Sequence, residues 1–78
     1  MPDIDMRAAR AALGEMWSLG RPLKASEMGR LLGLKGRDPG AQVLKWERGE
    51  PITGPVRVAV EMMLDGAIPR SASQLISR

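Results

Sequence analysis

The stretch "KGRDPG", residues 35–40, combines two cations with residues that form turns, and it directly precedes a helical pattern. Such a stretch could hold a phosphate, either as a nucleotide-binding loop or beside a helix that reads DNA. A nucleotide loop needs a preceding strand and a Gly-Lys-Ser/Thr ending, and the sequence has neither. Asp38 would also stand where a phosphate should lie. The stretch therefore favours a loop beside a helix over a nucleotide site.

Catalytic chemistry has little support in this composition. The chain contains no cysteine and no histidine, which removes thiolate nucleophiles, the commonest general base and zinc sites built from Cys and His. The acidic pairs Asp3/Asp5 and Glu47/Glu50 fall at predicted helix ends, where solvated or capping carboxylates are expected. We predict no enzyme, no metal site and no cofactor, and no small-molecule ligand is evident.

Positive charge is concentrated in the middle of the chain. The net charge is +3, but residues 21–48 contain seven Lys or Arg and only three acids. The remaining residues carry a slight excess of acids. This distribution predicts a face that binds a polyanion rather than a general solubility charge.

The apolar spacing predicts an all-α chain, because strand-like alternation is nearly absent. Helices are expected over about residues 5–19, 25–32 and 39–48, and a fourth from Thr53 as N-cap to Gly66. A tail from about residue 67 to 78 could add a fifth. Gly20 is expected to end the first helix. Gly14 and Gly29, inside helices, are expected where another helix packs closely.

The third predicted helix has the clearest start, with Asp38 as N-cap and Pro39 in the first helical position. On a helical wheel Val43 and Trp46 share the inner side, and Glu47 lies at its edge. The opposite side carries Ala41, Gln42, Lys45 and Arg48, with Leu44 on its flank. Gln can pair with adenine, and Lys or Arg can reach guanine or phosphate. An ordinary solvated helix face remains an alternative, because any surface helix has a polar outer side.

Three segments together resemble the Cro/C1-type, Xre-like helix-turn-helix family of transcriptional regulators: "LKASEMGRLLGL", "VLKWERGE" and "PITGPVRVAVEMML". The resemblance covers roughly residues 7–65. It implies a single Cro/lambda-repressor-like DNA-binding domain over residues 1–78, with four or five helices and the helix-turn-helix at about 24–49.

The resemblance also implies roles for individual residues. Gly29 would pack against the third helix, Gly33 would close the second, and Val43 and Trp46 would be core. The positions expected to point into the major groove are Gly40, Ala41, Gln42 and Lys45. Leu44 could add a base contact through a thymine methyl, and a tolerated exposed apolar residue is the alternative. The resemblance implies phosphate contacts at Arg48 and at the start of the second helix, where Lys24 and Ser26 are the candidates. Lys35 and Arg37, in the turn before the third helix, are further expected contacts with the DNA backbone.

Two departures from the family pattern stand out. The family usually has Thr-Gln at the start of the second helix, but this chain has Lys24-Ala25, so the glutamine contact and the usual cap are lost. The turn between the second and third helices is also longer than the common pattern by about four residues, and it carries Lys35 and Arg37.

The family implies a homodimeric repressor that binds an inverted-repeat operator, plausibly in its own promoter. Val58 and Met62 form an extra apolar edge on the fourth helix and are the candidate dimer contacts, with packing against the C-terminal tail as the alternative. An antitoxin-like module that binds another protein is the alternative. No signal-peptide pattern and no apolar run of membrane length is found, so a cytoplasmic protein is expected.

Overall fold

The computed structural model describes residues 4–72 and 75, and this part of the chain is helical without any strand. The elements are α1 (Met6–Met16), α2 (Ala25–Leu31), α3 (Pro39–Glu47), α4 (Gly54–Leu64) and the short 3-10 helix η1 (Arg70–Ala72). The all-α prediction is therefore confirmed. The predicted tail contributes η1, and most residues after it lie outside the described part.

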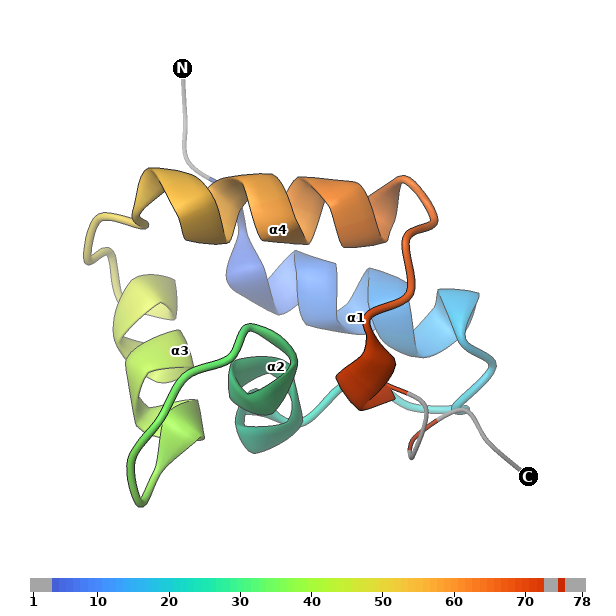
Figure 1. Ribbon diagram of the computed structural model, residues 1–78, viewed down its shortest axis with the longest axis horizontal. Coiled ribbons are helices and arrows are strands. Elements are labelled where there is room, and N and C mark those ends of the chain that lie inside the picture. The colour runs from blue at the N-terminus through green and yellow to red at the C-terminus, as the bar shows by residue number, and fades with distance from the viewer. Residues whose placement is uncertain (1–3, 73–74, 76–78) are drawn as a thin grey trace.

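The helices form two pairs (Figure 1). α1 lies along α4, and α2 lies against α3, which is the most extensive contact between elements. η1 returns to α2 and brings the C-terminal end of the described chain beside it. This arrangement leaves one side of α3 and one side of α4 without a covering helix.

One apolar core joins all four helices. Both tryptophans belong to it, and Trp17 and Trp46 are each 8% exposed, which confirms the predicted inner position of Trp46. Met16 at the end of α1 is 46% exposed. The other core residues are Met6, Ala9, Leu13, Leu23, Met28, Val43, Ile52, Val60, Met63 and Ala72.

The first helix ends three residues earlier than predicted. α1 stops at Met16, and Ser18 takes the left-handed conformation with a φ of 57°. The N–H of Leu19 then donates to the carbonyl of Gly14 at 2.9 Å. The prediction that Gly20 ends this helix is therefore wrong, because the reversal is made at Ser18.

The glycines inside α1 and α2 are both required by close contacts, but with different partners. A Cβ on Gly14 would collide with the carbonyl of Arg21, so α1 meets the returning loop and not another helix as predicted. A Cβ on Gly29 would collide with the carbonyl of Pro39 at the start of α3, which confirms the predicted helix contact. Gly33 closes α2 with a φ of 78°, as predicted.

Candidate nucleic-acid interface

The start of α3 is fixed by its own sequence. The Asp38 carboxylate accepts a hydrogen bond from the Ala41 N–H at 3.2 Å, and Pro39 is the first helical residue. Both features confirm the predicted helix start. The helix ends at Glu47, one residue before the predicted end, with Arg48 as its cap.

Gly40 anchors the start of α3 on the start of α2. It is buried, and a Cβ placed on it would lie 2.8 Å from the backbone nitrogen of Ser26. The expectation that Gly40 points into a DNA groove is therefore wrong, since this position is covered by α2. Together with the contact between Gly29 and Pro39, it sets how closely the two helices approach.

The outer side of α3 carries the remaining predicted base contacts. Lys45 is exposed, and Leu44 is 41% exposed although it is apolar. Ala41 and Gln42 are half-buried, because they lie near the end of α3 that contacts α2. The structure thus leaves Gln42, Leu44 and Lys45 accessible along one helix, over a buried side formed by Val43 and Trp46.

The predicted backbone contacts flank this surface at the start of α2 and in the loop before α3. Lys24 precedes α2, and Lys35 and Arg37 belong to the loop of residues 32–38. The tip of this loop lies on the side of the molecule away from α4 (Figure 1). Lys24, Lys35, Arg37 and Arg48 are exposed, and Ser26 is half-buried against Gly40.

Glu27 lies in the first turn of α2, where Lys24 as N-cap makes no side-chain cap hydrogen bond. Its carboxylate accepts a hydrogen bond from the Lys24 N–H at 2.8 Å. The same carboxylate accepts hydrogen bonds from both terminal nitrogens of Arg21, at 2.8 and 3.0 Å. The Arg21 guanidinium lowers the pKa of Glu27 and is the main cause of that shift.

Glu47 is also paired, which corrects the expectation of a solvated carboxylate. Arg10 of α1 donates from Nε and Nη2 to the two Glu47 oxygens at 2.8 and 2.9 Å. The two side chains are only 16% and 14% exposed. The sequence contained a signal for this pair, because Arg10 falls on the apolar side of α1 and Glu47 falls at the inner edge of α3.

The ion pairs Arg21–Glu27 and Arg10–Glu47 affect the charge of the candidate interface. Glu27 and Glu47 are neutralised by Arg21 and Arg10, and Asp38 is directed at the N-terminus of α3. Within the described residues, no ion pair engages the cations of the candidate interface, Lys24, Lys35, Arg37, Lys45 and Arg48. The surface therefore presents a strong excess of positive charge to solvent.

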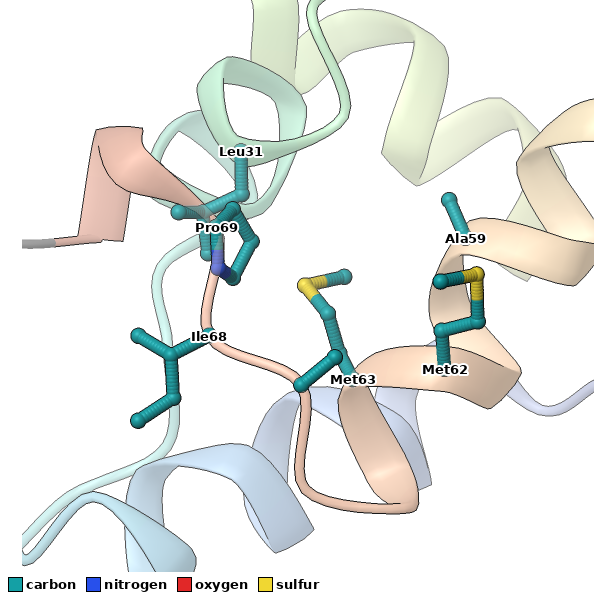
Figure 2. Close-up of a pocket in the computed structure, with 7 residues that line it drawn as sticks. Leu31, Ala59, Met62, Met63, Ile68 and Pro69 are labelled. Atoms are coloured by element: carbon teal, nitrogen blue, oxygen red, sulfur yellow. The ribbon is translucent and has the colours of Figure 1, made fainter.

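A second feature is an apolar groove of about 350 Å³ between α4 and the wall formed by α2 and the connector that follows α4. Figure 2 shows Ala59, Met62 and Met63 of α4 on one side, with Leu31 of α2 and the connector residues Ile68 and Pro69 on the other. Met62 and Ile68 are 56% and 60% exposed, and Val58 nearby is 53% exposed. Val58 and Met62 were predicted as an exposed apolar edge, but the groove itself was not.

Comparison with known proteins gives no relative for this chain: no protein-family model, curated protein or solved structure matches it. Among the described residues, no three His, Cys, Asp or Glu side chains come together as a metal site would require. No helix in the described part is both long and apolar enough to cross a membrane.

Proposed function

We propose that this protein binds double-stranded DNA in a sequence-specific manner, with α2 and α3 acting as the helix-turn-helix of a Cro/lambda-repressor-like fold. The observation that carries the proposal is the outer side of α3. It offers Gln42 and Lys45 to base edges, exposed cations lie on and around it, and Glu27 and Glu47 are each held by an arginine.

The contacts divide into two classes. Gln42, Lys45, Leu44 and Ala41 on α3 would read base edges in the major groove. Lys24, Ser26, Lys35, Arg37 and Arg48 would contact the phosphate backbone and hold the helix in register. The enlarged loop supports this division, because it adds two exposed cations, Lys35 and Arg37, directly before the helix that carries the base contacts.

The two classes of contact respond differently to mutation. Gln42→Ala or Lys45→Ala should cost about 1–3 kcal/mol on the preferred site and relax selectivity at one base position. Lys24→Ala or Arg37→Ala should weaken binding to all sequences alike, because phosphates carry no sequence information. Binding titrations on a preferred and a scrambled duplex measure both effects. Equal losses on both duplexes for all four variants would show that α3 does not read bases.

We propose further that the working unit is a homodimeric repressor on an inverted repeat, formed by two copies meeting at the groove beside α4. Val58 and Met62 form an exposed apolar strip on α4. Asp65 follows Met62 by three residues and Val58 by seven, so an acid borders this strip. Arg30 and Arg70 are exposed and stand next in sequence to Leu31 and Pro69, which line the facing wall.

A two-fold axis along the groove would therefore place the apolar strip of each copy in the groove of the other. The same axis would bring the acid of each copy to the basic residues of the other. In the standard arrangement of such dimers the two reading helices lie about 34 Å apart, one turn of DNA.

Sedimentation equilibrium tests the dimer without DNA. The wild-type chain should sediment as a dimer, and Met62→Glu should be monomeric because it places a carboxylate in the apolar groove. Met16→Glu is the matched control, since Met16 is exposed on α1 away from the groove lining, and it should remain dimeric. A wild-type monomer would contradict this interface and favour the antitoxin-like alternative, in which another protein occupies the groove.

A further inference from the structure

We propose that Arg10, although it lies on α1 and away from the candidate interface, is a positioning residue for the DNA-reading side of α3. The inference rests on the proposed function. It identifies the side chain that determines where Lys45 and Arg48 are held.

One guanidinium links three parts of the chain. Arg10 donates from Nε and Nη2 to Glu47 at the end of α3, and from Nη1 to the carbonyl of Leu23 at 3.1 Å, just before α2. The planar fork of an arginine allows two parallel bonds to a carboxylate and fixes their direction. Arg10 therefore holds the last turn of α3 in one orientation relative to α1 and to the approach to α2.

The two ends of α3 are held by different means. Its first turn is seated on α2 through Gly40 against Ser26 and Pro39 against Gly29. Its last turn is held by the buried Trp46 and by the ion pair of Glu47 with Arg10 of α1, and Glu47 stands in the sequence between Lys45 and Arg48. A shift at Glu47 would move the neighbouring Lys45 and Arg48 with it, and these are the cations of α3 proposed to meet DNA.

The pair also keeps a negative charge away from the ligand. The Glu47 carboxylate is 14% exposed and turned toward Arg10, although Lys45 and Arg48 nearby in the sequence are exposed. Without Arg10 it would be an unpaired anion at the end of the helix that approaches phosphates. Loss of Arg10 should thus weaken every sequence through charge, and weaken the preferred sequence further through misplacement.

The dissociation constant for a reference duplex divided by that for the preferred duplex separates these effects, because this ratio measures selectivity. The preferred duplex is the one that the wild-type chain selects from a randomised library, and the reference is a scrambled duplex of the same composition. Arg7→Met is the matched control for Arg10→Met, because Arg7 is exposed on the same helix and its loss changes the net charge equally. Circular dichroism verifies that each variant is folded at the assay temperature.

Arg10→Met should reduce the ratio by about tenfold, the equivalent of one lost base contact, and Arg7→Met should leave it unchanged. Arg10→Lys keeps the charge but loses the two parallel bonds of the guanidinium. It should bind the scrambled duplex like wild type, and its ratio should fall by less than that of Arg10→Met. A folded Arg10→Met with an unchanged ratio would overturn the inference.

Glu47→Gln provides the answer if Arg10→Met does not fold. Removing the carboxylate charge should tighten binding to the scrambled duplex, while breaking the fork should lower the ratio. Tighter binding to both duplexes by the same factor would mean that Glu47 acts through charge alone, which also overturns the inference. A library selection that yields no preferred sequence would instead contradict the proposed function.

Discussion

Glu27 makes two kinds of contact at the start of α2, one with the backbone and one with a cation. Its carboxylate accepts the Lys24 N–H at the start of α2 and both terminal nitrogens of Arg21. The pKa of Glu27 is lowered, first by its bond to Arg21 and also by its bond to the Lys24 backbone. The ionised form is therefore the one that the folded state stabilises.

The lowered pKa of Glu27 predicts a loss of stability in acid. Since the folded state binds this proton less readily than the unfolded state, Glu27 contributes stability above its ordinary pKa of 4.5, and the contribution disappears as pH falls through the lower folded value. Glu27→Gln should be less stable than wild type at pH 7, and the difference should shrink below about pH 4.5. Urea unfolding at several pH values measures this difference.

A matched control identifies the cause. Glu15→Gln removes an exposed carboxylate from α1 and should change the free energy of unfolding at pH 7 less than Glu27→Gln does. A Glu27→Gln difference that stayed constant from pH 7 to acid would contradict the proposed role of the ionised carboxylate.

Residue types predicted some contacts and missed others for a physical reason. The Asp38 cap and the burial of Trp46 follow from local sequence, because both depend on neighbours within one helix. The pair of Arg10 and Glu47 joins residues 37 positions apart, so its geometry depends on how helices cross. The inward side of Gly40 was missed for the same reason, since only the packed structure places α2 over it.

At the scale of elements, the crossing of α2 and α3 depends on a missing side chain. A Cβ at Gly29 would meet the Pro39 carbonyl, which belongs to backbone and cannot rotate away. Gly29→Ala should therefore destabilise the fold by about 1–3 kcal/mol, as overpacked substitutions in close contacts do, despite the better helix propensity of alanine. Chemical denaturation measures the free energy of unfolding.

Gly54 is the matched site for this substitution. It lies at the start of α4, where a Cβ would have no neighbour within 4 Å and the backbone φ is not positive. Gly54→Ala should be neutral or slightly stabilising. A Gly29→Ala variant as stable as Gly54→Ala would contradict the close approach of α2 to α3.

The positions of the helices were predictable, but some of their ends were not. Periodic apolar residues locate a helix because burial repeats with its turns, so all four α-helices were found. The end of α1 depends on a returning loop that crosses Gly14, and the reversal at Ser18 requires a left-handed conformation that a serine seldom adopts. The groove beside α4 was likewise missed, because its far wall comes from α2 and the connector.

For the whole molecule, the structure separates two surfaces of different character. One is the positive surface around α3 with its loop, and the other is the apolar groove beside α4. A dimer formed through the groove would leave the positive surface of each copy available, and two-fold symmetry would match an inverted repeat in DNA. The prediction of a polyanion-binding face from charge distribution agrees with the exposed cations, while DNA as the ligand remains the proposal.

The most direct test is a salt titration of binding to the DNA upstream of the gene, compared with a scrambled duplex. If each of two copies places Lys24, Lys35, Arg37 and Arg48 on phosphates, affinity should fall by about 10³–10⁵-fold between roughly 50 and 200 mM salt. The upstream duplex should also bind more tightly than the scrambled one at every salt concentration. Absent binding, or an affinity independent of salt, would contradict the account.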